Sequence, residues 1–224
     1  MMIKKLSLSF ILILLGSTFS LARPVVDDDP KEIGKELWLE FGLSKKFTSQ
    51  FSSVVLFNSL NQLNSSFKNY DNYIEGILKY KLDKSYALEL LYRQEYSKED
   101  DGTDVIEKRP QIRAGYTFDL ASWNFRNRYK YELRLFENGL VKHRYRTDFQ
   151  IKAPWTFSSF HFGPYMNEEL SVSSGELSMS RCYLGLSGGN NQYSRSLYLV
   201  WQMNREKFGW SNMLGAGISW EICL

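Results

Sequence analysis

Charged and apolar residues alternate in the segment 124–152, which reads NFRNRYKYELRLFENGLVKHRYRTDFQIK. At the helical step of about 100° per residue, its lysines and arginines would point in all directions and leave no apolar stripe. At the strand step of about 180°, Arg126 and Arg128 share one face, whereas Tyr129 and Leu133 share the other. The pattern therefore predicts two β-strands that form a hairpin around the sequence ENG.

The same alternation runs from Glu36 to the end of the chain. Eleven segments of roughly 10 to 14 residues show it, which is long enough for transmembrane strands of about 10 residues. Between them, LDKS, DLAS, KAPW and GGNN are short, whereas NQLNSSFKNYD and SKEDDGTDVIEK are longer and more polar. Short turns at one rim and longer loops at the other are typical of outer-membrane barrels, which normally have an even number of strands. We predict an all-β fold, an antiparallel transmembrane β-barrel of ten or twelve strands.

Alternation alone does not say whether the apolar face points into a core or out to lipid. This face carries large side chains and almost no charge, as Leu197 and Leu199 illustrate. Tyrosines and tryptophans gather near segment ends, where membrane proteins place interfacial aromatic girdles. The last segment has Trp220 and Leu224 on one face and resembles the C-terminal signal that the barrel assembly machinery reads. We expect outer-membrane lipid outside the barrel, and a soluble periplasmic β-barrel binding protein is the alternative.

The first residues read MMIKKLSLSFILILLGSTFSLARPVV. Two lysines precede an apolar run that is shorter than the ~20 residues of a transmembrane helix, and small residues follow it. We predict a signal peptide over residues 1–22 with cleavage near Ala22, a periplasmic leader over 23–35 and the barrel over 36–224. This organisation predicts the outer membrane of a Gram-negative bacterium.

Composition narrows the classes of partner and site. The net charge of +3 is small and spread along the chain, so no nucleic-acid partner is expected. Cys182 shares a strand face with Leu184, whereas Cys223 shares one with Glu221, so the two cysteines are predicted to point to opposite sides of the wall and stay unpaired. Two scattered histidines and two scattered cysteines do not make a zinc site, and we expect no cofactor.

If the apolar face meets lipid, the charged face lines the lumen, the interior of the barrel. The predicted lumen charge network consists of Arg126, Arg128, Lys130, Glu132, Arg134, Lys142, Arg144, Arg146, Asp148, Lys152, Glu75, Glu89, Glu169 and Arg181. Eight of its cations lie on the hairpin 124–152 with only two acids, so acids of other strands must reach them. Such pairs would brace the lumen. The alternative is a passage for small, preferably anionic, solutes.

Several stretches together carry a resemblance: ELWLEFGLSKKF, NRYKYELRL, HRYRTDFQIK, YMNEEL, RCYLGLSGG and LYLVWQMN. In these, the chain resembles a family of small predicted outer-membrane β-barrels that carries only a domain-of-unknown-function label. The likeness covers the chain from about Glu36 to the end. It implies a barrel in the outer membrane and no established activity.

A membrane-embedded hydrolase acting on lipid or peptide is a further alternative. Lipid-cleaving barrels need a serine and a histidine that meet on the lipid-facing wall. At that spacing His143 has Tyr145, a poor substitute, while His161 has Ser159 in the reversed order. The acidic loop KEDDGTD contains no histidine that could complete a protease site. No catalytic residue is predicted.

Overall fold

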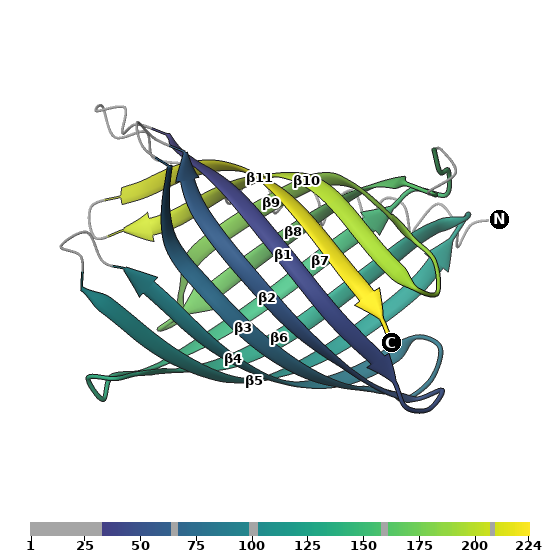
Figure 1. Ribbon diagram of the computed structural model, residues 1–224, viewed down its shortest axis with the longest axis horizontal. Helices are drawn as coiled ribbons and strands as arrows, with labels where there is room; N and C mark the ends of the chain where they lie inside the picture. The colour runs from purple at the N-terminus through teal and green to yellow at the C-terminus, as the bar shows by residue number, and fades with distance from the viewer. Residues whose placement is uncertain (1–32, 64–66, 99–102, 158–160, 207–208) are drawn as a thin grey trace.

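The computed structural model describes residues 33–63, 67–98, 103–157, 161–206 and 209–224. These residues form one closed barrel of tilted strands (Figure 1). The strands are β1 Gly34–Lys46, β2 Phe51–Leu63, β3 Phe67–Lys81, β4 Tyr86–Lys98, β5 Asp104–Leu120, β6 Trp123–Phe136, β7 Val141–Lys152, β8 Gly163–Ser173, β9 Glu176–Gly189, β10 Tyr193–Glu206 and β11 Gly209–Cys223. The predicted all-β barrel is confirmed. The proposed signal peptide and residues 23–32 of the proposed leader lie outside the described residues.

The barrel closes through a parallel pair, β1 with β11, which we call the seam. Glu40 lies beside Ser219 in this pair, and Gly42 lies beside Glu221. The other neighbouring strands are consecutive in the chain and antiparallel, as β6 and β7 illustrate. The eleven segments of the sequence thus become eleven strands, not the expected ten or twelve. An odd number brings the first and last strands round in the same direction, so a parallel ladder must join them.

The strand order around the barrel shows which strands lie opposite the seam. In the closed order, β6 is the fifth strand from β1 in one direction and the fifth from β11 in the other. The strand β6 therefore lies opposite the seam, and inward side chains of β6 face those of β1 and β11 across the lumen.

The two ends of the chain of strands lie at opposite rims of the barrel. The C-terminal rim holds Cys223 and the connections that contain LDKS, DLAS, KAPW and GGNN, whereas the opposite rim holds Gly34 and the turns 137–140 and 174–175. The grouping of connections follows the sequence interpretation, but their lengths do not. Only residues 174 and 175 separate β8 from β9 at the opposite rim, and β5 begins at Asp104, within the stretch interpreted as a long polar loop.

The outer face of the barrel is apolar. Leu90, Tyr129 and Tyr145 are each 60% exposed, and Leu199 is 59% exposed. Outward aromatic rings also stack along neighbouring strands, with the Phe118 and Phe125 centroids 5.0 Å apart. Large apolar side chains that face outward around a charged interior reverse the arrangement of a soluble barrel.

An aromatic cluster fills part of the lumen beside the seam. The rings of Trp38, Tyr183 and Tyr198 meet edge to face, with centroids 5.6 to 6.4 Å apart. Gly217 of β11 makes room for this cluster, because a Cβ atom there would overlap the Tyr198 ring. A small residue on one strand thus seats a large ring from the next.

The two cysteines lie on β9 and β11. Cys182 and Cys223 are both free, as the opposite strand faces predicted. Within the described ranges, we find no helix with the length and apolarity needed to cross a membrane.

Candidate functional site

The candidate site is a cavity of about 620 Å³ inside the barrel, lined by side chains from all eleven strands. Its basic lining residues are Lys79, Arg93, Arg109, Arg113, Arg126, Arg128, Lys130, Arg134, Arg144, Arg146 and Arg181. Its acidic lining residues are Glu40, Asp71, Glu75, Glu89, Glu95, Glu169 and Glu221. Three further acids of the wall, Glu107, Glu132 and Asp148, do not border the cavity and are buried against it. The cavity surface is consequently more basic than the wall as a whole.

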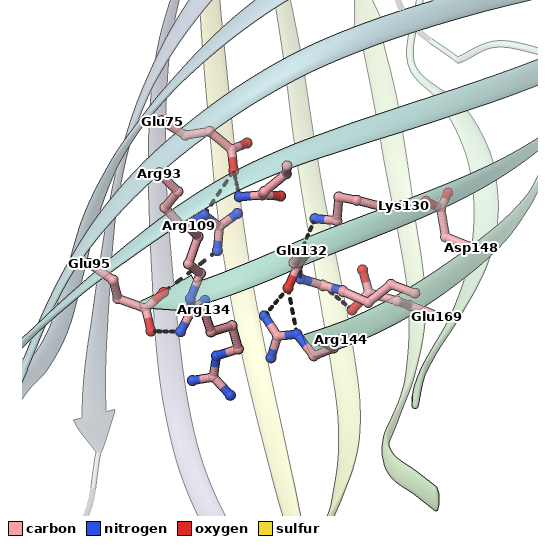
Figure 2. A network of polar contacts seen from close by, with 12 residues as sticks. Glu75, Arg93, Glu95, Arg109, Lys130, Glu132, Arg134, Arg144, Asp148 and Glu169 are labelled. Carbon is pink, nitrogen blue, oxygen red and sulfur yellow. Dashed lines mark hydrogen bonds and ion pairs between the residues drawn. The ribbon is translucent and has the colours of Figure 1, made fainter. Parts of the chain in front are cut away.

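Glu132 on β6 is the most enclosed charge of the described residues, with an exposed fraction of 0%. Its Oε1 atom lies 2.8 Å from Lys130 Nζ and 3.0 Å from Arg146 Nη1. Its Oε2 atom accepts a hydrogen bond of 2.5 Å from Arg144 Nε. The β6–β7 register places Arg144 directly beside Glu132, and the alternation of the strands brings Lys130 and Arg146 to the same face. One carboxylate therefore holds three cations (Figure 2).

Ion pairs continue from this carboxylate around the wall towards β10. Arg146 bridges Glu132 to Glu169 on β8, and Glu169 also accepts a hydrogen bond of 3.3 Å from Arg181 Nη1 on β9. Arg181 in turn donates to the Gln202 amide oxygen on β10. Each step joins adjacent strands, so the chain of contacts ties five neighbouring strands together on their inner face.

A second chain of ion pairs runs the other way, from β6 to β3. Arg134 on β6 pairs with Glu107 on β5 at 2.5 Å, and Arg109 contacts both Glu107 and Glu95 on β4. Arg93 then joins Glu95 to Glu75 on β3, with Arg93 Nε 2.8 Å from Glu75 Oε2. Arg109 and Glu107 are each 4% exposed, so these contacts are shielded from solvent. Figure 2 shows Glu75, Arg93, Glu95 and Arg109 of this chain in the same region of the wall as Glu132.

A third group lies closer to the C-terminal rim. Glu89 pairs with Arg113 on β5 and with Lys79 on β3, the latter at 3.4 Å. Asp148 accepts hydrogen bonds of 2.8 and 2.9 Å from Arg128 Nε, whereas its nearest contact to Arg126 is 3.9 Å.

The charges of this third group do not balance. Two carboxylates serve four cations. Moreover, Arg126 Nε is buried without a hydrogen-bond partner among the described residues.

Within the described ranges, the acids of the seam, like Asp71 on β3, lack the cationic partners that the other acids lining the cavity have. Glu40 Oε1 accepts a hydrogen bond of 2.8 Å from the Ser219 hydroxyl, and it has no cation within 4 Å in the described structure. Glu221 forms neither an ion pair nor a hydrogen bond with any described residue. We call Glu40 and Glu221 the seam acids.

The structure places the residues of the predicted charge network as follows. All but two of them take part in ion pairs on the inner face. The exceptions are Lys142 and Lys152, which do not line the cavity. Lys142 is exposed near the rim with its Nζ 5.4 Å from the Phe136 ring centroid, and Lys152 is near the other end of the same strand.

The expected partners of the β6–β7 cations are only partly those found. Glu169 does reach this hairpin, through Arg146, but Glu75 and Glu89 pair with Arg93 and Arg113 of nearer strands. Glu107 takes Arg134 instead. Sequence reasoning missed Glu107 because it lay in a polar stretch interpreted as a loop. The alternation extends back through Arg109 to Glu107 and was the signal that could have placed it.

The two histidines do not form a hydrolytic site with the described residues. His143 lies on the outer face, where its Nδ1 atom is 2.6 Å from the Tyr131 hydroxyl and its ring stacks on Tyr131. His161 is exposed in the β7–β8 connection, whereas Ser159 lies outside the described residues. No group of three His, Cys, Asp or Glu residues in the described ranges is arranged to hold a metal ion.

A comparison with protein families gives one match. The model described as "Protein of unknown function (DUF2490)" matches residues 35–212, which span β1 to β10 and part of β11. No curated protein matches the chain.

Proposed function

Because the chain belongs to the family described as Protein of unknown function (DUF2490), which names no activity, we propose a function from its geometry. The protein is an outer-membrane β-barrel whose lumen is braced by ion pairs and encloses a small, charged cavity. The barrel lies in the outer membrane of a Gram-negative bacterium. The barrel assembly machinery inserts the chain after removal of a signal peptide over residues 1–22.

The observation that carries this proposal is the outward exposure of large apolar side chains. Leu90 on β4, Tyr145 on β7, Leu199 on β10 and Leu214 on β11 are all more than half exposed, and they come from widely separated parts of the wall. Burying such side chains in lipid is favourable, whereas exposing them to water on every side would be costly and would promote aggregation. The exposed apolar outer face therefore disfavours the soluble periplasmic binding protein.

Bracing is favoured over a wide pore by the way the charges are used. Glu132, Arg109 and Glu107 are at most 4% exposed. Each of them contacts at least two charges of opposite sign. Charges buried in a low-dielectric wall are tolerated when they are paired and hydrogen-bonded. The cavity that remains is of the size that takes one small solute.

A second candidate function, passage of small anionic solutes, is supported by the cations that border the cavity without balancing acids. Arg126 and Arg128 both border the cavity and share Asp148, which is buried. The hydrolase alternative has no comparable support, because His143 is paired with a tyrosine.

Cell fractionation tests the proposed location. The protein should be recovered in the outer-membrane fraction and should migrate differently on gels before and after boiling. Recovery in a detergent-free periplasmic extract would overturn the proposal. Planar bilayers then separate the two roles of the lumen, because a braced barrel should show little conductance and a passage should show conductance with anion preference.

The double variant Arg128→Gln with Arg144→Gln separates the two roles when both its unfolding in urea and its anion permeability in planar bilayers are measured. For a braced lumen it should lower the urea concentration at the unfolding midpoint without altering anion permeability. For a passage it should reduce the anion preference.

A further inference from the structure

The cavity has an unequal distribution of charge across its width. The seam acids Glu40 and Glu221 line one side of it. Arg126 and Arg128 come from β6, the strand opposite the seam, and line the other side. Carboxylates that have no cationic partner in the described structure therefore lie on the opposite side of the lumen from two arginines that share one carboxylate.

This separation differs from the rest of the wall. Elsewhere, most acids pair directly with bases on adjacent strands, as Glu132 does with Arg144 and Glu75 with Arg93. Among the described residues, Asp71 on β3 is the exception on the other walls of the cavity. In the part of the chain that the structure describes, the Glu221 carboxylate has no ion pair or hydrogen bond, and the Arg126 guanidinium has one carboxylate oxygen, at 3.9 Å, near the limit of an ion pair. If the lumen charges served bracing alone, the cavity would have no reason to keep these two sets apart.

A solute between the two sides would gain from both. An anion is attracted to the Arg126 side but repelled by the seam acids, and a cation experiences the reverse. A molecule that carries a carboxylate at one end and an ammonium group at the other satisfies both sides at once. Inside the barrel wall these interactions are stronger than they are in bulk water.

We propose that the cavity binds a small zwitterion, with its carboxylate towards Arg126 and Arg128 and its ammonium group towards Glu40 and Glu221. Arg126 borders the cavity, and its only ion-pair contact among the described residues is at 3.9 Å, so its guanidinium keeps donors for the carboxylate. The Glu221 carboxylate and the second oxygen of Glu40 supply acceptors for the ammonium group, while Ser219 holds the first oxygen of Glu40 in place. The proposal deepens the proposed function, since it names the class of solute that the lumen of the barrel would hold.

The experiment uses the full mature chain, refolded in detergent micelles, and three probes of equal length. These are 4-aminobutanoate, which is zwitterionic, butanoate, which is anionic, and 1-aminobutane, which is cationic at neutral pH. Saturation-transfer difference NMR detects weak binding of each probe and gives its Kd by titration. We expect 4-aminobutanoate to bind at least tenfold more tightly than either singly charged probe, since charge-assisted hydrogen bonds form at both ends.

Two single variants divide the site. Arg126→Gln should weaken 4-aminobutanoate binding about tenfold and abolish butanoate binding, while leaving 1-aminobutane unaffected. Glu221→Gln should weaken 4-aminobutanoate to a similar extent and abolish 1-aminobutane binding only. Arg205→Gln is the matched control, because Arg205 pairs with Glu176 in an exposed position away from the cavity lining and should leave all three Kd values unchanged.

The gel shift on boiling shows whether each variant is folded, so a loss of binding in an unfolded variant is not counted. Equal affinity for the three probes, tighter binding of butanoate than of 4-aminobutanoate, or no binding of 4-aminobutanoate to the folded wild-type protein would each overturn the inference. Fractionation of cells tests the outer-membrane location separately, so failure of one proposal is distinguishable from failure of the other.

Discussion

Arg144 Nε donates a hydrogen bond of 2.5 Å to Glu132 Oε2 across the β6–β7 pair, at a point where the Glu132 side chain is completely buried. The other carboxylate oxygen of Glu132 is within 3.0 Å of both Lys130 and Arg146. A buried carboxylate with three cations is sensitive to removal of its charge, because the cations stay behind without compensation.

The change Glu132→Gln should therefore strongly destabilise the barrel. Removing one member of a buried, paired group typically costs about 3–5 kcal/mol. Urea unfolding of the protein in phospholipid vesicles, followed by tryptophan fluorescence, measures this change. Glu137→Gln is the control, because Glu137 is exposed in the β6–β7 turn and should shift the midpoint very little. Equal midpoints for the two variants would mean that the Glu132 contacts do not brace the wall.

The packing of Tyr198 over Gly217 leads to a second prediction. A Cβ atom on Gly217 overlaps the Tyr198 ring, so Gly217→Ala should destabilise the barrel by about 1–3 kcal/mol through overpacking. In a Tyr198→Leu background the same change should cost clearly less, since the ring that it strikes is gone. Gly76→Ala is the matched control, because a Cβ atom on Gly76 meets nothing within 4 Å. Unfolding midpoints of the four proteins and of the double variant test the coupling.

Much of this architecture could be predicted from strand alternation. Even-numbered charges from Arg126 to Arg134 required a two-sided strand, and that period alone assigned inner and outer faces that the register now shows. The number of strands could not be fixed in the same way. The barrel closes through a parallel contact between β1 and β11, which are far apart in sequence. Alternation carries no information about which strand edges pair.

Pairing of the charges was also beyond the sequence. Face assignment places Glu75, Glu89 and Glu169 inside, but a partner depends on register between strands and on the reach of each side chain. Glu75 meets Arg93 because those two residues lie side by side in the β3–β4 register. Glu107 was overlooked because acidic and polar neighbours made the start of β5 look like part of a loop.

The outward position of Leu199 supports a third prediction. Leu199 is 59% exposed on the outer face, so Leu199→Arg should place a cation in lipid at a cost of about 2–4 kcal/mol near the membrane midplane and should impair insertion. Gln150→Arg is the control, because Gln150 lines the cavity, where a further charge can remain hydrated. The amount of each variant in the outer membrane, and its shift on boiling, measure insertion. Similar insertion of the two variants would contradict the assignment of the faces.

The odd number of strands makes a fourth prediction, about orientation. Gly34 and Cys223 lie at opposite rims, so a C-terminus in the periplasm places the start of β1 at the outer surface of the cell. In this orientation β1 would start outside the cell, which conflicts with the prediction of a periplasmic leader before it. The strand also begins earlier than the predicted leader ends, because Gly34 and Lys35 already belong to β1. Either the C-terminal rim faces outward, or the chain approaches β1 from the outer side.

Labelling of introduced cysteines decides between these two orientations. In a chain whose own Cys182 and Cys223 are replaced by Ser, Asn138→Cys places a thiol in the β6–β7 turn at the opposite rim, and Lys84→Cys places one in the β3–β4 turn at the C-terminal rim. Because the barrel assembly machinery that reads the C-terminal strand acts from the periplasm, we expect the C-terminal rim to be periplasmic. A maleimide attached to a large polyethylene glycol should then label the Asn138→Cys protein in intact cells, and it should label the Lys84→Cys protein only after the outer membrane is permeabilised. The reverse pattern would place the C-terminus outside and restore the periplasmic leader, whereas labelling of both sites in intact cells would argue against a membrane-spanning barrel.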